Sequence, residues 1–408
     1  MQKTKQFQGS LIVYIIIFLA ALTLRLLLLG DSPLREYEAG FAFQAWELVQ
    51  GHPAEIGSQV AALSLTDLFF FLFGSSDFTA RLWSALMGSA LVWLPYFGRH
   101  QLGKWPALLT AVGLAVDPGL VSVSRFAGSP LPALLFLLGG LLLLREQKWG
   151  WGLFSLGLAL FSGPRFWLGV LIFWVALALV NWLGPDESLA NLRQGAGELV
   201  ESFRREEKGF WGPGLALVAL FIIGSFYLQN FSGLTAWAES LPAFLRGFTV
   251  SSDFSAGRML AALAAYQPLA LILGGIAMVK GWVEKDPLRK VLSLCFFGAL
   301  LPVLLYPARQ GADLAWALLP LYALAALTTV GIVQRRTQRV IVFLLAGLLL
   351  VMAALGWLSF TGIIVQAGNP QAVLLQWGII AAAAALLVIA AAIVAAEWSW
   401  KTASQGLL

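Results

Sequence analysis

Carboxylates gather in one short stretch near the beginning of the chain: Asp31, Glu36, Glu38 and Glu47. A carboxylate in a partly dry pocket beside a membrane can take a proton from a hydroxyl group, as a general base does. The dipeptide Ser32-Pro33 predicts the start of a helix, with Ser32 as the N-cap and Pro33 in the first turn. Acids near a helix start also complement the helix dipole. A catalytic and a structural interpretation therefore both stay open for Glu36 and Glu38.

Arginines occur where the chain is expected to leave the membrane. The planar guanidinium group can give two parallel hydrogen bonds to a phosphate, which makes candidates of three residues: Arg125, Arg165 and Arg309. Ordinary contact with lipid headgroups is the alternative for each of them. Arg81 falls just inside the end of an expected span, where an ionisable side chain must find a partner or reach the headgroups. Asp77 or an acid of the first loop is its expected partner.

Several other kinds of chemistry are not indicated. Cys295 is the single cysteine, which excludes a disulfide framework and a cysteine-based metal site. His52 and His100 lie far apart in the sequence, so we expect no metal site, although a requirement for a divalent metal stays open. The chain has no Walker motif, no glycine-rich fingerprint after a strand and no Ser/His/Asp arrangement. The donor of any transferred group must therefore arrive another way, most simply through the lipid.

The elements that must position these residues are membrane helices. Of the 408 residues, 59% are hydrophobic and 12% are charged, against roughly 25% charged residues in soluble domains. Apolar runs approach or exceed the roughly 20 residues that a helix needs to cross a bilayer. In lipid a segment must satisfy its own backbone hydrogen bonds. We therefore expect an all-α polytopic membrane protein, with residues 1–408 forming a single membrane domain and with no nucleic-acid partner.

Twelve spans are expected, at residues 10–30, 78–98, 105–121, 130–144, 149–163, 166–184, 210–229, 263–281, 290–306, 312–333, 340–364 and 373–396. The apolar stretch Val60–Phe73 is short and contains Asp67, so we expect a helix that lies in the membrane interface or dips into it. If the N-terminus is cytoplasmic, most of the basic residues fall on the cytoplasmic side, as the positive-inside rule requires. Both termini are therefore expected to be cytoplasmic.

Three loops between the expected spans are long. The extracytoplasmic loops 31–77 and 230–262 are expected to carry the functional site, because binding and catalysis concentrate on loops held by a rigid scaffold. In the cytoplasmic loop 185–209, apolar residues near helical spacing among charges predict an amphipathic helix on the membrane surface. No internal repeat is apparent, which gives no support to a transporter built from inverted repeats.

The order of short motifs along the chain is familiar. The motifs are Phe73-Gly74 through Arg81-Leu82 to Gly88, the stretch Gly103–Ala111 at the start of a span, Pro118 followed by Ser124-Arg125, and Arg309 followed by Leu318–Tyr322. This order resembles the GT-C membrane glycosyltransferases, the group that includes protein mannosyltransferases and aminoarabinose transferases. The resemblance is clear over about residues 10–145 and thinner afterwards.

The resemblance implies an enzyme that takes a sugar from a polyprenyl-phosphate carrier and passes it to a hydroxyl on the extracytoplasmic face. It also implies an acceptor-activating carboxylate in the first loop, usually within an Asp-Glu pair, and the matching pair in this chain is Tyr37-Glu38. Glu38 is thus the expected base, with Glu36 as a nearby substitute. Arg309 or Arg125 is expected to bind the donor phosphate. Three further residues are expected to line or support the site: Asp31, Tyr37 and Arg81.

Two alternatives stay open. Tyrosine is a poor base at neutral pH because its pKa is near 10, and His52-Pro53 stands where the group has a Lys-Pro-Pro-Leu stretch. These departures favour a non-catalytic protein of the same fold that binds a lipid-linked glycan or a partner subunit. A lipid or solute transporter is less favoured, because the last two expected spans are nearly free of charge. The expected location is a bacterial inner membrane, in the cell envelope.

Overall fold

The computed structural model describes residues 2–52, 55–184, 211–252 and 254–334, together with short stretches between residues 347 and 386. Within these residues the regular elements are helices and there is no strand, which confirms the expected all-α class. Residues Met1–Leu327 form one compact unit and Thr328–Leu408 form a second. The expected spans 340–364 and 373–396 and the expected amphipathic helix 185–209 lie largely outside the described residues.

The described helices are mostly short and follow one another closely along the chain. In the first half of the chain they are α1 (Gln2–Leu26), α2 (Glu36–Val49), α3 (Val60–Phe73), α4 (Asp77–Ala90), α5 (Trp93–Leu102), α6 (Lys104–Val116), α7 (Pro118–Ser124), α8 (Leu131–Arg145), α9 (Trp149–Leu160) and α10 (Pro164–Leu183). In the second half they are α12 (Trp211–Gly224), α13 (Gly233–Ala236), η2 (Trp237–Glu239), α14 (Ser240–Arg246), α15 (Ala256–Tyr266), α16 (Pro268–Val283), α17 (Pro287–Leu305), η3 (Gly311–Leu314) and α18 (Ala315–Gln334).

Apolar helices make this chain an integral membrane protein. Three described helices are long and apolar enough to cross a bilayer by themselves: Pro164–Leu183, Pro287–Leu305 and Gly311–Val333. Two more candidates are bent pairs, α6 with α7 and α15 with α16. The remaining apolar helices, including α3, α8, α9 and α12, are shorter. The described residues therefore hold three to five candidate spans by this measure, and the expected number of twelve stays a prediction.

Both bends fall where a proline begins the second helix. The chain turns by 56° between α6 and α7 and by 95° between α15 and α16. Asp117 precedes Pro118 and Gln267 precedes Pro268. The proline ring disfavours the helical conformation for the residue before it. The expected span 263–281 is for this reason divided, with its first residues in α15 and the rest in α16.

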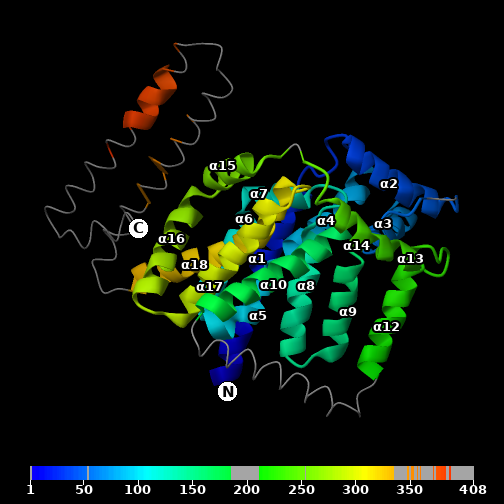
Figure 1. Ribbon diagram of the computed structural model, residues 1–408, viewed down its shortest axis with the longest axis horizontal. Coiled ribbons are helices and arrows are strands. Elements are labelled where there is room, and N and C mark those ends of the chain that lie inside the picture. Colours follow the sequence, from blue (N-terminus) through cyan, green and yellow to red (C-terminus); the bar gives the residue numbers. More distant parts are fainter. Residues whose placement is uncertain are drawn as a thin grey trace. The chain divides into compact units, whose positions relative to one another are not determined.

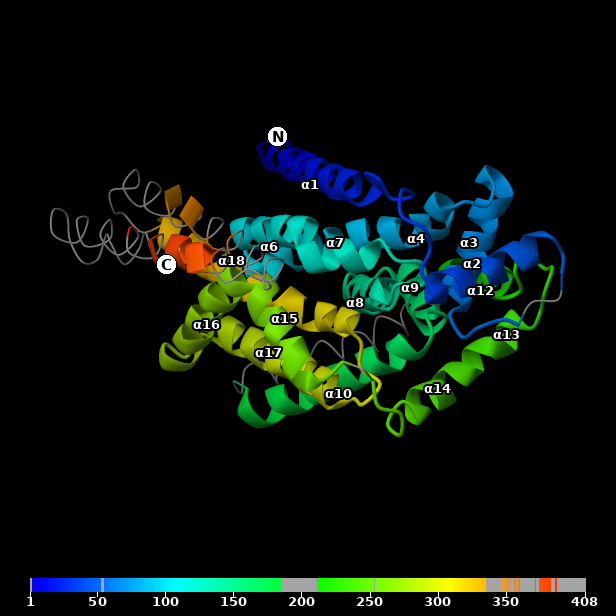
Figure 2. The ribbon, with the colours of Figure 1, turned by 90° about the horizontal axis from the view of Figure 1, so that it is seen from above.

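The first unit has a layered arrangement of helices. Seen from above, α1 lies along one side beside α4 and α6, while α10 and α17 lie together along the other side (Figure 2). The last two approach closely, since a Cβ atom added to Gly298 of α17 would lie 2.6 Å from the Cα atom of Ala176 in α10. Small residues at such crossings let helix backbones pack tightly in a membrane.

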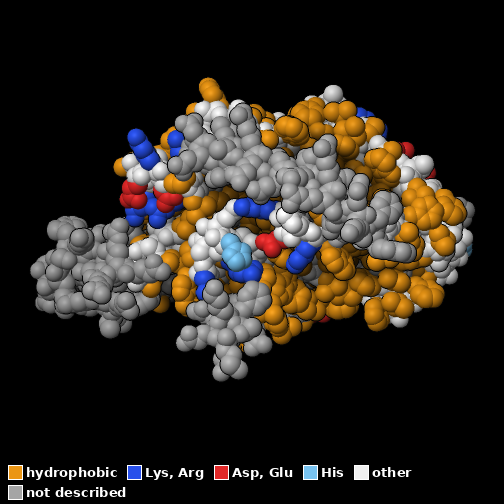
Figure 3. All heavy atoms as spheres, turned by 90° about the horizontal axis from the view of Figure 1, so that it is seen from below, with side chains coloured by type: hydrophobic (Ala, Val, Ile, Leu, Met, Phe, Trp, Pro, Cys, Tyr) orange, Lys and Arg blue, Asp and Glu red, His pale blue; other side chains and the backbone are white. Residues whose placement is uncertain are grey.

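The two ends of this unit differ in character. The short helices α2, α3, α13 and α14 lie at the end away from the N-terminus (Figure 1). The opposite end presents Lys and Arg side chains in a polar area bordered by apolar ones (Figure 3). Helix ends there carry four basic residues: Arg99, Lys104, Arg145 and Lys148. The end with the short helices contains the candidate site.

Candidate functional site

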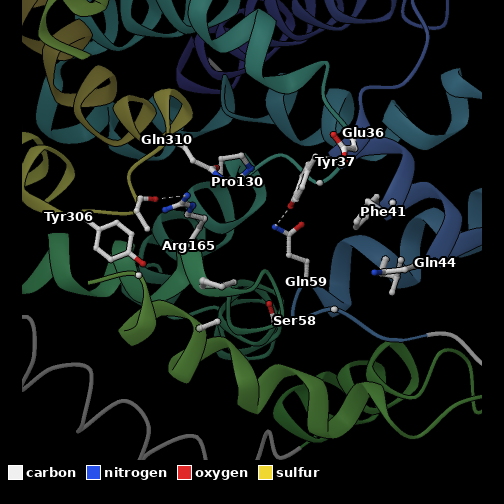
Figure 4. Close-up of a pocket in the computed structure, with 18 residues that line it drawn as sticks. Glu36, Tyr37, Phe41, Gln44, Ser58, Gln59, Pro130, Arg165, Tyr306 and Gln310 are labelled. Carbon is white, nitrogen blue, oxygen red and sulfur yellow. Dashed lines mark hydrogen bonds between the residues drawn. The ribbon is translucent and has the colours of Figure 1, made fainter. Parts of the chain in front are cut away.

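A cavity of about 510 Å³ opens among the short helices. Its walls come from α2, the residues before α3, the turn that leads into α8, the start of α10, α14, and the turn after α17 (Figure 4). The polar side chains of the lining are Glu36, Tyr37, Gln44, Ser58, Gln59, Arg165, Tyr306 and Gln310. Segments far apart in the sequence thus share one space in which a carboxylate, a guanidinium group and neutral hydrogen-bonding groups meet.

Glu38 lies behind this cavity rather than in its lining. Its side chain is 2% exposed, and it forms an ion pair with Arg81, which is 3% exposed. Arg81 Nε donates to Glu38 Oε1 at 2.8 Å and Arg81 Nη2 donates to Oε2 at 2.9 Å. The backbone N–H groups of Ala127 and Arg35 donate to the same two oxygens, at 2.9 and 3.1 Å. Each carboxylate oxygen therefore accepts two hydrogen bonds.

These contacts decide the protonation state of Glu38. Burial alone would raise the pKa of its carboxyl, but the hydrogen bonds from Arg81 and from the backbone of Ala127 and Arg35 outweigh burial and hold the pKa below its ordinary value. A carboxylate held in this way has neither the basicity nor a free position for an acceptor hydroxyl. The geometry thus favours a positioning role for Glu38 over the role of base predicted from the resemblance.

Arg81 joins the start of α2 to the end of α1. It also donates to the backbone carbonyls of Leu29, Ser32 and Pro33, at 3.1, 2.7 and 3.1 Å, and to the Ser32 hydroxyl at 3.4 Å. The acid that pairs with Arg81 is thus Glu38 of the first loop, not Asp77. Because the linker between the two helices is fixed by these contacts, the residues just before Glu38 have a defined orientation toward the cavity.

Glu36 and Tyr37 occupy the first turn of α2 and line the cavity. The Tyr37 hydroxyl accepts a hydrogen bond from Gln59 Nε2 at 3.4 Å (Figure 4). The Glu36 carboxylate is exposed and makes no hydrogen bond or ion pair within the described part of the chain. Of the two acids expected to be catalytic, Glu36 is therefore the one that a molecule in the cavity can reach.

Arg165 provides the positive charge on the far wall of the cavity. Gly163, with a φ of 84°, and Pro164 begin α10, which places Arg165 in the first turn of that helix. Its Nη1 atom lies 3.1 Å from Oδ2 of the fully buried Asp313, and its Nη2 donates to the carbonyl of Ala308 at 3.4 Å. The buried carboxylate holds the guanidinium group in place while the side chain lines the cavity (Figure 4).

The two arginines expected to bind phosphate have other contacts. Arg125 donates to the carbonyls of Leu27 and Leu28, at 2.7 and 2.9 Å, just beyond α1. Arg309 donates to the carbonyl of Phe254 at 2.9 Å and to that of Leu304. Neither belongs to the cavity lining, and neither does the exposed Asp31. Of the three arginines named from the sequence, Arg165 is the one that lines the cavity.

Gln44, Gln59 and Gln310 were not predicted as site residues. Amides carry no charge and belong to no motif, so the signal for them in the sequence was their place in or near the expected loops. Gln59 directly precedes α3, and Gln310 directly precedes η3. No group of three or more His, Cys, Asp or Glu side chains suited to a metal ion occurs among the described residues.

Comparison with known proteins shows a similarity of fold. No family model matches the sequence, and no curated protein matches it. The structure is similar to that of ArnT from Cupriavidus metallidurans bound to undecaprenyl phosphate, with a TM-score of 0.57, 14% sequence identity, and coverage of 99% of this chain and 74% of that chain. For ArnT in the apo state the values are 0.52, 14%, 100% and 74%. The GT-C resemblance expected from the motifs is confirmed at the level of fold.

Proposed function

We propose that this chain is a membrane glycosyltransferase that uses a sugar linked to a polyprenyl phosphate and transfers it to a hydroxyl acceptor. The observation that carries the proposal is the cavity in which the carboxylate of Glu36 and the guanidinium group of Arg165 line one space. The fold supports it, because one ArnT structure of this fold is bound to undecaprenyl phosphate. Lipid is thus a partner twice, as the surrounding membrane and as the carrier of the sugar.

Each group in the proposed reaction has a definite task. Glu36 takes the proton from the acceptor hydroxyl, whose oxygen then forms a bond to the anomeric carbon of the sugar. The bond between that carbon and the phosphate oxygen breaks, and the electron pair leaves with the polyprenyl phosphate. Arg165 donates hydrogen bonds to the phosphate and stabilises the charge that grows on it. Glu38 does not touch the reactants and instead fixes the first turn of α2.

The distribution of charge supports an orientation in the membrane. The end of the unit that carries the N-terminus is rich in Lys and Arg (Figure 3), and cytoplasmic ends have such an excess. We therefore place the N-terminus in the cytoplasm and the cavity on the extracytoplasmic side. In a bacterial inner membrane this side would face the cell envelope, where lipid-linked sugars and their acceptors meet.

A second candidate function has an observation of its own. Tyr37 occupies the place where the GT-C resemblance implies the first acid of an Asp-Glu pair. The second acid, Glu38, forms a buried ion pair with Arg81. A protein that binds a lipid-linked glycan without transferring it would need no base. This candidate differs from the first in one measurable respect, the release of the carrier phosphate.

The test uses the protein in lipid nanodiscs with a polyprenyl-phosphate hexose and a cell-envelope extract as the source of acceptor. We expect release of polyprenyl phosphate, and we expect Glu36→Gln to lower the rate by about 10²- to 10⁴-fold, the range typical of a lost general base. Glu47→Gln in the same helix is the matched control, because Glu47 lies outside the cavity lining. Binding without release would favour the second candidate, and full activity in Glu36→Gln would remove Glu36 from the mechanism.

A further inference from the structure

The Tyr37 hydroxyl is held at the cavity by an amide from a different element. Gln59 Nε2 donates to it at 3.4 Å, so the hydroxyl oxygen already accepts one hydrogen bond. The proton of this hydroxyl has no acceptor within the described part of the chain. Tyr37 is 63% exposed and lines the cavity (Figure 4). The group is therefore a hydrogen-bond donor that is oriented by the protein and open to a ligand.

Two glycines leave room for the Gln59 side chain in this position. A Cβ atom on Gly163 would lie 2.8 Å from Gln59 Cγ, and one on Gly128 would lie 3.2 Å from Gln59 Oε1 and 3.4 Å from Tyr37 Cε1. Both glycines have positive φ angles, 84° and 70°, which other residues rarely adopt. The backbone can therefore pass close to the Gln59 side chain on both sides.

The other amide atom shows that this arrangement is not optimal for stability. Gln59 Oε1 is buried and has no hydrogen-bond partner among the described residues. Buried polar atoms without partners are uncommon and call for an explanation. A role in orienting the Tyr37 hydroxyl is such an explanation.

The charges of the lining limit what kind of ligand Tyr37 can meet. Arg165 is paired with the buried Asp313, and Glu36 is the single carboxylate of the described lining. In the proposed function Glu36 acts on the acceptor. The remaining polar groups of the lining are uncharged, and the phenol of Tyr37 is neutral at physiological pH because its ordinary pKa is near 10. No carboxylate of the described lining is left to bind a cationic amino group on the sugar.

We propose that Tyr37, positioned by Gln59, donates a hydrogen bond to a hydroxyl group of the transferred sugar, and that this sugar is uncharged. The inference rests on the proposed function and adds the chemical class of the donor and the residue that selects it. Tyr37 is the recognition residue because it touches the sugar, and Gln59 is a positioning residue because it acts through Tyr37.

The experiment compares three lipids in nanodiscs: undecaprenyl phosphate, its glucose ester and its glucosamine ester. Glucose and glucosamine differ in one hydroxyl that is replaced by a charged amino group, so their relative kcat/KM reports the charge preference. We expect the wild-type protein to prefer the glucose lipid. Tyr37→Phe should raise KM for the glucose lipid by about two- to tenfold, the value of one hydrogen bond. Affinity for undecaprenyl phosphate, which lacks a sugar, should stay unchanged.

Two further variants separate recognition from a loss of structure. Gln59→Leu should raise KM in the same direction as Tyr37→Phe and have little further effect in the double variant, because both remove one contact. Tyr37→Asp should shift the ratio of kcat/KM toward the glucosamine lipid, by about tenfold or more for a new ionic contact. Gln50→Leu, at the exposed end of α2, is the matched control and should behave as wild type.

Four results would overturn the inference. A wild-type preference for the glucosamine lipid would show that the sugar is charged, while leaving the proposed transfer reaction intact. Equal KM values in wild type, Tyr37→Phe and Gln59→Leu would show that these residues do not contribute to recognition of the sugar. A general loss of affinity that includes undecaprenyl phosphate would indicate a structural role. Absence of phosphate release from every lipid would instead contradict the proposed function on which the inference stands.

Discussion

At the scale of single residues, Glu38 and Arg81 form the best-connected ion pair of the candidate site. Each oxygen of the carboxylate accepts one hydrogen bond from the guanidinium group and one from the backbone. Removing one member of a buried pair leaves an uncompensated charge and costs roughly 3–5 kcal/mol. Replacing both members by apolar residues of similar size is much less harmful. This contrast separates a positioning role from a catalytic one.

We predict that Glu38→Leu and Arg81→Met each lower the apparent Tm and the transfer rate strongly, and that the double variant recovers part of both. The reason is that the double variant buries no unpaired charge. The measurements are thermal unfolding in detergent and the rate of phosphate release in nanodiscs. If the double variant regains stability while activity stays at zero, Glu38 is a base after all.

Part of this site could be predicted from the sequence, and part could not. The cluster of acids follows from residue types, and a first-loop acid was one of the two partners expected for Arg81. The predicted helix start at Ser32-Pro33 was too early, because α2 begins at Glu36 with Arg35 as its N-cap. Which acid faces the cavity does not follow, because it depends on Arg81 and Ala127, which approach Glu38 from other parts of the chain. That Arg125 and Arg309 lie outside the cavity lining did not follow from the sequence either, because Arg125 contacts Leu27 and Leu28 and Arg309 contacts Phe254, all in distant segments. Phosphate binding by either residue stays a prediction.

At the scale of elements, α3 carries a buried acid that the proposed reaction does not use. Asp67 is 4% exposed, and burial raises the pKa of its carboxyl to about 6. The expectation that Val60–Phe73 is a helix holds. It has 14 residues, about 21 Å at 1.5 Å per residue, which is shorter than a bilayer core of about 30 Å. An acid is easier to accommodate in a helix of this kind than in a full span.

We predict that Asp67→Asn stabilises the protein at pH 8 and has little effect near pH 4. The pKa of Asp67 is higher in the folded than in the unfolded protein, so the folded state binds this proton more tightly. Stability linked to the group is present at low pH and is lost as the pH rises from about 4 through 6, by at most about 3 kcal/mol. The apparent Tm measured against pH for the variant, the wild type and the exposed control Asp31→Asn tests this. A variant curve parallel to that of the wild type would contradict the prediction.

The two bent helix pairs are joined by a buried polar contact. The Tyr322 hydroxyl of α18 lies 2.7 Å from Asp117 Oδ2 and 2.6 Å from Gln267 Oε1, and Gln267 Nε2 also donates to Asp117. Asp117 and Gln267 are the residues at which the two pairs bend. The dipeptides Asp117-Pro118 and Gln267-Pro268 could have indicated the bends in advance. Their mutual contact could not be foreseen, since 150 residues separate them.

We predict that Tyr322→Phe destabilises the first unit by about 1–3 kcal/mol, because it removes the buried hydroxyl proton that Asp117 Oδ2 or Gln267 Oε1 accepts. The apparent Tm in detergent should fall accordingly. Tyr96→Phe in α5 is the control, because the hydroxyl of Tyr96 makes no hydrogen bond within the described residues. An equal Tm for Tyr322→Phe and wild type would show that the bends are set by their prolines alone.

At the scale of the molecule, the candidate site belongs to the unit Met1–Leu327. Its walls include residues from 36 to 310, so almost the whole length of this unit contributes to one cavity. Composition was enough to predict the helical membrane class. The assembly of the cavity was beyond sequence reasoning, because it depends on which helix ends meet. The single cationic residue of the described lining, Arg165, comes from the start of α10, where only the dipeptide Gly163-Pro164 marks the position.

The first turn of α2 divides its residues between two tasks, and this division affects how such a protein can change over generations. Glu38 faces inward, where almost any replacement would damage the fold, whereas Glu36 and Tyr37 line the cavity. A mutation at position 37 can therefore alter which sugar is accepted without a large loss of stability. Descendants of one ancestral sequence could acquire different donors through this position, while the neighbouring acid and its arginine stayed constant.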